Sequence, residues 1–194
     1  MQIRYIAHIV IEADTPLKVG SGSSDFLQDS PLQKDWNGLP MILGTSIAGV
    51  LRKDFDIKKV NDIFGDEDAK KKDSKGSKVI ISNALLLDEK EQVHEGLLLE
   101  KTPFLNHFET LPIREHTAIN DKGVAKKHAK FDEEVLYKGT RFKFSIEVLQ
   151  DKESFDAILG LLSSPSFRLG GGSTKGFGKL KILSITTDSF DIHS

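Results

Sequence analysis

The sequence contains no cysteine, and this absence excludes several kinds of site at once. Without thiols the chain has no disulfides, no cysteine-based zinc ribbon and no thiol nucleophile. Any nucleophile that acts here is therefore water or an oxygen atom of a substrate or a side chain.

Long apolar runs and a strong charge bias are also absent. No apolar run is long enough to cross a membrane, and the N-terminal MQIRYIAHIVIEADT alternates instead of forming the apolar block of a signal peptide. The 194 residues carry a formal net charge of −2. We therefore expect a single cytoplasmic domain, residues 1–194, with no membrane partner, in which any nucleic-acid site is a local patch.

Hydrophobic periodicity predicts an α+β fold. In RFKFSIEVL apolar and polar residues alternate, which is typical of a strand with one buried face. GTSIAGVLRKDF and DKESFDAILGLLSS instead space their apolar residues for one helical face, with Thr45 or Ser46 as the N-cap of the first. The order is β-α-β-β-α-β, that of a ferredoxin-like sheet with both helices on one face. The strands are expected at 3–12, 78–87, 141–149 and 179–187, and the helices at 44–55 and 151–164.

Two segments do not fit this minimal pattern. Residues 65–78, GDEDAKKKDSKGSK, are rich in charge and poor in apolar side chains, which predicts a mobile loop. Residues 88–138 separate the second and third strands and are too long for a hairpin turn, so we expect them to form a small projection.

A glycine-rich stretch, RLGGGSTKGFGKLKI, leads into the last predicted strand. Glycine lets a backbone approach a ligand closely, and consecutive N–H groups can form an anion-binding concavity. No acidic residue occurs from 167 to 187, while Arg168 and Lys175 supply positive charge, so the stretch suits a phosphate backbone. The alternative is that the glycines only turn the chain into its last strand.

Residues 114–130 form a second basic segment, with five lysines or arginines against two acidic residues. The segment is either a binding patch or a solvated loop. Within it, His116 and His128 are either a catalytic acid and base or ordinary surface histidines.

Aspartates precede the first predicted helix at Asp25, Asp29 and Asp35. Carboxylates near a phosphate path can hold a divalent cation or orient water for attack on a phosphodiester. Asp is also common in loops for turn-forming reasons, so spacing alone leaves both interpretations open.

The start of the first predicted helix is a candidate phosphate site. Gly44, Thr45 and Ser46 lead into the helix, where N–H groups and hydroxyls meet the positive end of the helix dipole. Arg52 lies two turns on, and its side chain reaches either the same strand of nucleic acid or an acidic partner.

Five blocks occur along nearly the whole chain in a characteristic order. They are PLKVGSG, DSPLQKDWNGLPMILGTSIAGVLR, IFGDEDAKKKDSKGSKVIISNALLL, REHTAINDKGVAKKHAKFDEEVLYKGTRFKF and RLGGGSTKGFGKLKI. Together they resemble the RAMP superfamily of CRISPR-associated proteins, in particular the repeated backbone subunit of type III effector complexes. The glycine loop alone is moderately specific, whereas five blocks in register are highly specific.

The resemblance implies an RRM-related, ferredoxin-like core that stacks head to tail along a guide RNA (crRNA). A thumb-like hairpin, residues 105–130 here, would interrupt the guide–target duplex at regular intervals. Other implied partners are target RNA, copies or paralogues of the subunit, the large polymerase-like subunit and the small subunits. The residues expected to bind RNA are Gly44, Thr45, Ser46, Arg52, Arg114, His116, Gly171, Gly172 and Lys175.

The resemblance also implies cleavage of target RNA in antiviral defence. DSPLQKD puts Asp29 at the position of the family's catalytic aspartate, with Asp35 as the second Asp and Asp25 as a competing candidate. Asp29 would position the attacking 2′-hydroxyl or a water bound to Mg²⁺ or another divalent cation. The family's usual lysine at the helix start is Ala48 here, which removes one expected phosphate contact.

Two other functions fit the same sequence. One is a non-catalytic RNA-binding assembly subunit of the same complex. The other is a stand-alone endoribonuclease that processes guide RNA, with His116 or His128 as general acid or base. The near-neutral charge argues against the second, because a stand-alone RNA enzyme gains affinity from a broader basic face.

Overall fold

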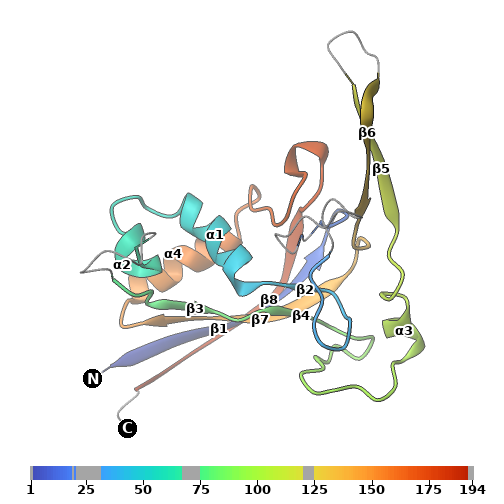
Figure 1. The fold of residues 1–194 in the computed structure, drawn as a ribbon. Helices are drawn as coiled ribbons and strands as arrows, with labels where there is room; N and C mark the ends of the chain where they lie inside the picture. The colour runs from blue at the N-terminus through green and yellow to red at the C-terminus, as the bar shows by residue number, and fades with distance from the viewer. Residues whose placement is uncertain (1, 19, 21–31, 67–74, 120–124, 192–194) are drawn as a thin grey trace.

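The computed structural model describes residues 2–18, 20, 32–66, 75–119 and 125–191, with the backbone alone for most of 115–133. Its main body is a six-stranded antiparallel sheet with helices on one side (Figure 1). The strands of this sheet are β1 (Ile3–Ala13), β2 (Met41–Ile42), β3 (Val79–Ile81), β4 (Ala84–Leu86), β7 (Arg141–Leu149) and β8 (Leu180–Asp191). The helices are α1 (Gly44–Asp54), α2 (Val60–Phe64), α3 (Pro103–Asn106) and α4 (Lys152–Leu162). A separate hairpin consists of β5 (Ile113–Ile119) and β6 (Ala125–Glu134).

β1 and β7 form the centre of the sheet, with Ile9 opposite Phe144. Successive side chains of a strand point to opposite faces, so one face carries these buried residues while the other carries the exposed His8 and Lys143. The buried face is covered by apolar side chains of α1 and α4, namely Ile47, Leu51, Phe155 and Ile158. Burial of apolar surface, at roughly 25 cal/mol per Å², is the main stabilising contribution of this layer.

The predicted mixture of α and β structure with an antiparallel sheet is confirmed. Strands predicted at 3–12, 141–149 and 179–187 are β1, β7 and β8, and the two predicted helices are α1 and α4. Along the sheet the order is β2-β4-β7-β1-β8, and β3 also pairs with β7. The short strand β2, which pairs with β4, was not predicted.

The single strand predicted at 78–87 is wrong, because this segment forms the two short strands β3 and β4. Ile81 lies opposite Ile146, whereas Leu85 lies opposite Lys143. The segment therefore has one more residue than β7 between these two pairs. This is a β-bulge, which shifts the buried positions from odd to even residue numbers.

The residues at the bulge, Ser82 and Asn83, use their side chains to hold neighbouring elements. The Ser145 N–H donates to Ser82 Oγ over 2.8 Å. The Gly44 N–H donates to Asn83 Oδ1 over 2.9 Å. The bulge in the sheet thereby fixes the start of α1.

The N-cap predicted at Thr45 or Ser46 is wrong, because α1 begins at Gly44 with Leu43 as its N-cap. Leu43 makes no side-chain capping hydrogen bond, and the Asn83 amide supplies the acceptor instead. A Cβ on Gly44 would overlap the carbonyl group of Ile81, so glycine lets the helix begin against the sheet.

The insertion at 88–138 consists of two parts. The first contains α3, and its Leu105, Phe108 and Leu111 are buried in the main core. The second is the hairpin β5–β6, which projects away from the body (Figure 1). The projecting part therefore begins near Ile113, and the segment before it packs on the body.

Most of the loop predicted at 65–78 lies outside the described residues. Its described ends are joined by hydrogen bonds, since the Asp66 N–H donates to the Lys75 carbonyl over 3.1 Å and the Lys78 N–H to the Ile63 carbonyl over 2.8 Å. Among the described residues no helix has the length and apolar character needed to cross a membrane.

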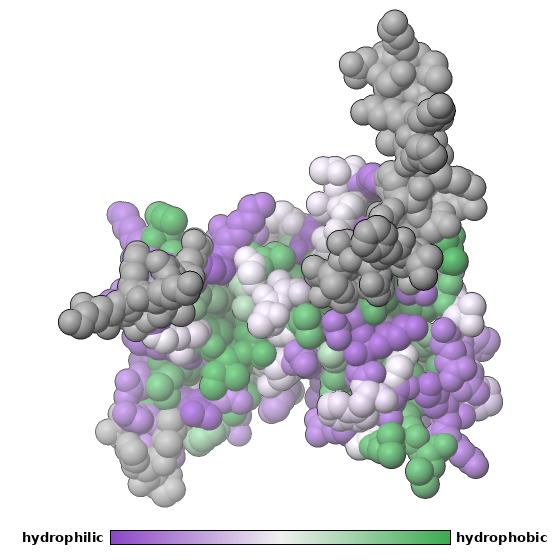
Figure 2. Space-filling model, viewed as in Figure 1, coloured by the Kyte–Doolittle hydropathy of each residue, from purple (hydrophilic) through white to green (hydrophobic). Residues whose placement is uncertain are grey.

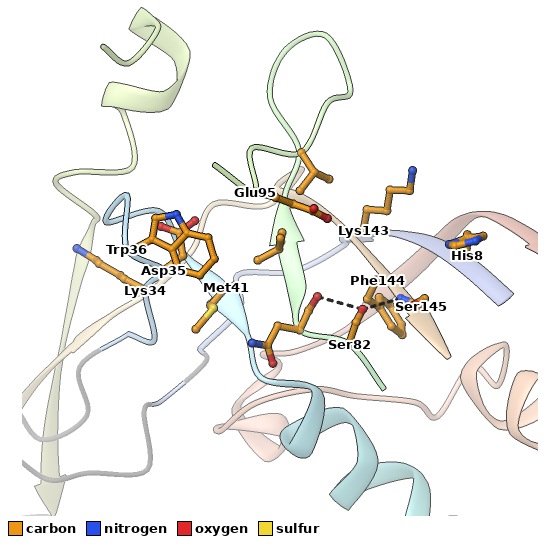
Figure 3. A pocket seen from close by; sticks show the side chains of 13 residues that line it. His8, Lys34, Asp35, Trp36, Met41, Ser82, Glu95, Lys143, Phe144 and Ser145 are labelled. Atoms are coloured by element: carbon orange, nitrogen blue, oxygen red, sulfur yellow. Dashed lines mark hydrogen bonds between the residues drawn. The ribbon is translucent and has the colours of Figure 1, made fainter. Parts of the chain in front are cut away.

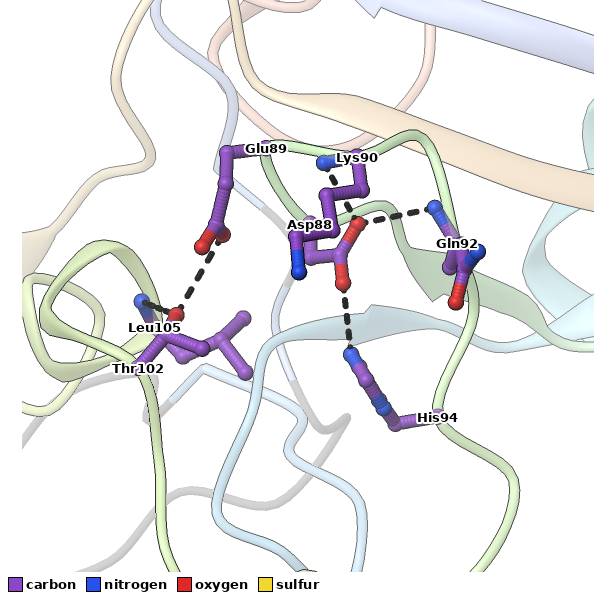
Figure 4. Close-up of polar contacts among 7 residues, drawn as sticks. All are labelled: Asp88, Glu89, Lys90, Gln92, His94, Thr102 and Leu105. Carbon is purple, nitrogen blue, oxygen red and sulfur yellow. Dashed lines mark hydrogen bonds and ion pairs between the residues drawn. The ribbon is translucent and has the colours of Figure 1, made fainter.

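Asp88, shortly after β4, organises the loop that follows (Figure 4). Its side chain is 5% exposed, and its Oδ1 accepts from the N–H groups of Lys90 and Gln92 over 2.8 Å each. Its Oδ2 lies 2.8 Å from His94 Nε2. Burial raises the pKa of Asp88, but the Gln92 N–H, the His94 ring and the Lys90 N–H together outweigh burial and hold this pKa below its usual value.

Asp88→Ala is expected to lower the free energy of unfolding by about 1–3 kcal/mol at neutral pH, because two backbone donors lose their acceptor. Since folding lowers the pKa of Asp88, its contribution is complete above the ordinary pKa and is lost as the pH falls through the lowered value. Urea unfolding at neutral pH and at about pH 3 measures both effects. Asp54→Ala, which removes an exposed carboxylate of α1, is the control. The same wild-type advantage at both pH values would contradict the prediction.

Candidate nucleic-acid interface

The glycine-rich stretch forms a compact loop around the short turn η1 (Ser173–Lys175), just before β8. A Cβ on Gly170 would overlap the carbonyl group of Lys18, and one on Gly178 would overlap that of Leu169. Both space and backbone conformation therefore require glycine. The glycines of this loop with φ between 75° and 85° are Gly170, Gly172, Gly176 and Gly178.

Backbone N–H groups of this loop bind the protein itself. The Gly171 N–H donates to the Lys18 carbonyl over 3.0 Å, and the Gly178 N–H donates to the Pro16 carbonyl over 3.1 Å. These donors hold the loop on the chain that follows β1 and are not available to an anion. The glycines do turn the chain into β8, and a phosphate would meet the exposed side chains of the loop more readily than its N–H groups.

Arg114, near the start of β5, lies against this loop. Its guanidinium carbon is 5.5 Å from the centroid of the Phe177 ring, which is only 4% exposed. This is the geometry of a cation–π contact. It places the base of the hairpin beside the loop that carries the exposed Gly171 and Lys175 and the half-buried Gly172.

A groove of about 390 Å³ beside the start of α1 forms the second part of the candidate site. It is lined by Gly44, Thr45, Ala48 and Arg52, together with residues of α2 and β3, whereas Ser46 does not line it. In the space-filling view apolar side chains gather near α1 and β3 (Figure 2). Ala48 thus adds no charge to the groove wall, and Arg52 is its cationic residue.

Arg52 holds α1 to the end of α2. Its Nη1 donates to the Gly65 carbonyl over 2.6 Å, and its Nη2 donates to Asn61 Oδ1 over 2.8 Å. These bonds orient the guanidinium and stabilise the corner between the two helices. The exposed side chains at the start of α1 are those of Thr45 and Ser46, whose hydroxyls are the polar groups nearest the helix end.

Other basic residues near the glycine loop are used within the protein. Lys179 Nζ lies 2.6 Å from Asp14 Oδ2, and this hydrogen bond and charge hold the pKa of Asp14 below its usual value. Arg168 donates to the Pro165 carbonyl over 2.7 Å. Arg114 and Lys175 are both exposed, Arg114 against the glycine-rich loop and Lys175 within it.

The predicted catalytic residue Asp29 and its competitor Asp25 lie outside the described residues. Asp35 is described, and its Oδ1 accepts from the N–H groups of Asn37 and Leu39 over 2.8 and 2.9 Å, so this carboxylate closes a turn. Within the described part of the chain no group of three or more His, Asp or Glu could hold a metal ion. A divalent cation stays a prediction that rests on Asp25 and Asp29.

The structure brings the predicted residues together in two groups, with Arg114, Gly171, Gly172 and Lys175 in one and Gly44, Thr45 and Arg52 in the other. Figure 1 shows the hairpin, the η1 loop and α1 on the same side of the sheet. The backbone of His116 lies in β5 opposite Phe131, but the side chains of His116 and His128 are outside the description.

Two residues that sequence reasoning missed shape this site. Asn83 binds the first residue of α1, and Phe177 lies beneath Arg114. The polar pair Ser82-Asn83 inside an apolar run was a usable signal for the first. For Phe177 no such signal exists, because an aromatic residue between two glycines gives no indication of its partner.

Comparison with known proteins identifies a family and similar solved structures. The family model of the RAMP superfamily matches residues 10–181. The chain is similar to a chain in the cryo-EM structure of the type III-B Cmr-beta bound to cognate target RNA, with 17% sequence identity and a TM-score of 0.63. The match covers 95% of this chain and 60% of that chain. It is similar to one in the type III-B Cmr-beta apo state, at 19% identity and a TM-score of 0.63, covering 91% of this chain and 96% of that chain. No curated protein matches the sequence.

Proposed function

Because the chain belongs to the RAMP superfamily, we propose that it is a backbone subunit of a type III CRISPR effector complex in antiviral defence. In this role it binds guide RNA along the RNA backbone and cleaves complementary target RNA, with Mg²⁺ or another divalent cation as cofactor. Its proposed partners are both RNAs, further copies or paralogues of the subunit, the polymerase-like subunit and the small subunits, in the cytoplasm. The similar fold of a chain in a complex with cognate target RNA supports this proposal.

The observation that carries the proposal is the contact between Arg114 and Phe177. It joins a projecting hairpin to a loop that has exposed positive charge. An RNA strand that crosses the loop would meet Arg114 and Lys175, with β5–β6 standing beside the strand. This is the arrangement expected of a thumb that enters a guide–target duplex, with the buried segment around Leu105 as its anchor.

Binding of this kind reads the RNA by the shape and charge of its backbone. The segment 167–187 has no acidic residue, and the exposed groups of the loop suit phosphate and sugar contacts, which position an RNA without reading its sequence. With a net charge of −2, one chain binds RNA weakly. An array binds tightly, because the few phosphate contacts of each subunit add along the strand.

The proposed core is ferredoxin-like and RRM-related. The strand sequence β8-β1-β7 followed by β3 and β4, with α1 and α4 on one face, supports this interpretation. In this arrangement the start of α1 and the loop before β8 lie on the side of the sheet that bears the helices, so one RNA strand could pass both.

The test of the proposal is assembly on guide RNA. Lys175→Ala is expected to weaken binding by the array and to reduce the slope of log affinity against log salt by about 0.7 per subunit, because one phosphate contact is lost. Fluorescence anisotropy of labelled guide RNA across a salt series measures both. The control is Lys90→Ala, which removes an exposed lysine after β4. A wild-type slope near zero would refute the backbone-binding function.

A further inference from the structure

A second cavity, of about 740 Å³, lies on the face of the sheet that the helices do not cover. Its floor includes Leu85 and Ser145 of β4 and β7, and Trp36 lines one wall. Figure 3 shows Trp36 and Lys34 on one side of the cavity, with Lys143 and His8 on the other. This cavity shares no residue with the groove beside α1.

Trp36 is displayed on a turn that is held rigidly. The Asp35 carboxylate closes the turn, and Asn37, which is 7% exposed, donates from Nδ2 to the Gly96 carbonyl over 2.9 Å. The Leu98 N–H in turn donates to Asn37 Oδ1 over 2.9 Å. The indole on this fixed turn is nevertheless 70% exposed. A large aromatic side chain held in solvent by a rigid turn is preorganised for a ligand.

The opposite wall supplies a lysine ammonium group and an imidazole ring. Lys143 and His8 are both exposed, and they project from neighbouring strands on the uncovered face, because His8 pairs with Ser145 and Val10 with Lys143. Lys143 makes no ion pair within the described part of the chain. Glu95, on the rim, adds one acceptor.

We propose that this cavity binds one unpaired nucleotide of single-stranded RNA. The base stacks on Trp36, Lys143 and His8 bind the phosphate, and Glu95 accepts from a base amino group or the ribose 2′-hydroxyl. A volume of about 740 Å³ accommodates a ligand of this size. Two acidic residues, Asp35 and Glu95, line the cavity beside these basic side chains, which favours a single nucleotide over a longer stretch of phosphate backbone. The proposal rests on the RNA-binding function proposed above.

Trp36 is the only tryptophan in the chain, so its fluorescence reports on this cavity alone. Titration of the full chain with an unstructured single-stranded RNA is expected to quench this emission in a saturable manner. Lys143→Ala is expected to shift the titration to higher RNA concentration and to reduce its salt slope by about 0.7. Lys90→Ala, which removes an exposed lysine outside both the cavity and the glycine-rich stretch, is the matched control and is expected to behave as wild type.

Anisotropy of the labelled RNA, recorded in parallel, separates this proposal from the function on which it rests. RNA binding without a change in Trp36 emission overturns the nucleotide site and leaves the proposed function intact. Absence of RNA binding by the assembled array overturns both. A change of emission with protein concentration in the absence of RNA shows that another copy of the chain covers Trp36, which also overturns the nucleotide site.

Photo-crosslinking identifies the RNA that supplies the nucleotide. 5-Bromouridine is placed in either the guide or the target strand of the reconstituted complex, and crosslinked peptides are identified by mass spectrometry. A crosslink to Trp36 from one strand supports the proposal and names the source. No crosslink from either strand overturns it.

Discussion

Asp29→Asn is expected to lower the rate of target-RNA cleavage by the reconstituted complex by about 10²–10⁴-fold, while assembly on guide RNA is unchanged. Asn matches Asp in size but has no charge and is not a general base. The variant therefore cannot position an attacking water or 2′-hydroxyl through a carboxylate. Labelled target RNA, incubated with Mg²⁺ and separated by size, reports the loss as the disappearance of regularly spaced cuts.

Asp35→Asn is the matched control for this experiment. The amide oxygen of the new side chain can still accept from the N–H groups of Asn37 and Leu39, so we expect the turn and the cleavage to persist. Loss of cleavage in Asp25→Asn instead of Asp29→Asn would transfer the catalytic role to Asp25. Cleavage that depends on neither aspartate would contradict the prediction. It would favour a non-catalytic assembly subunit, with the cut made elsewhere in the complex. Cleavage that depends on His116 or His128 would instead favour a histidine-based endoribonuclease.

The chemistry of the cut ends distinguishes the two roles left open for Asp29. Attack by the 2′-hydroxyl leaves a 2′,3′-cyclic phosphate and needs no bound water. Attack by water leaves no cyclic product, and its dependence on a divalent cation is measured by adding a chelator. The donor chemistry of Asp25 and Asp29 suits a hard cation such as Mg²⁺.

The parts of the fold that sequence predicted are those with strong periodicity. β7 alternates over its whole length and β1 alternates from Ala7 to Ala13, because one face meets the helices and the other meets solvent. α4 begins where Asp151 accepts from the Ser154 N–H, a capping signal that is visible in sequence. In these elements local pattern and tertiary contact favour the same structure.

The parts that sequence missed depend on contacts between distant residues. Asn83 takes part in a bulge because its amide binds Gly44, and α1 starts at Gly44 because that residue touches Ile81. A single-strand interpretation of 78–87 fails because periodicity cannot indicate such pairs. Trp36 escaped attention for the same reason, since its exposure results from hydrogen bonds between Asn37 and a loop far along the chain.

The candidate site also has residues that the sequence located and contacts that it missed. Sequence located the glycine loop, Lys175 and Arg114 but not their contact, which runs through the buried Phe177. It also interpreted the loop as a source of free N–H donors, whereas Gly171 and Gly178 donate to carbonyls of the chain after β1. Composition thus indicated where positive charge gathers, and only the structure showed which N–H groups already donate hydrogen bonds within the protein.

Gly178→Ala is expected to be among the most destabilising substitutions in the chain, costing more than about 3 kcal/mol. Its φ is +79°, which disfavours a side chain by about 1–2 kcal/mol, and a Cβ would overlap the carbonyl group of Leu169. Relief of that overlap would break the bond from the Leu169 N–H to the Gly178 carbonyl, which is 3.0 Å long. Thermal unfolding should show a fall in Tm of at least about 6 °C for a chain of this length.

Gly176→Ala separates backbone strain from steric overlap in the same loop. Gly176 has a φ of +85°, but nothing lies within 4 Å of its ideal Cβ, so its substitution should cost only the strain of about 1–2 kcal/mol. Equal losses in the two variants would show that close packing on Leu169 contributes nothing. If Gly178→Ala alone also weakens guide-RNA binding by the folded protein, the loop must hold its native shape to present Lys175 and Arg114, and the glycines then serve RNA binding through the turn that they permit.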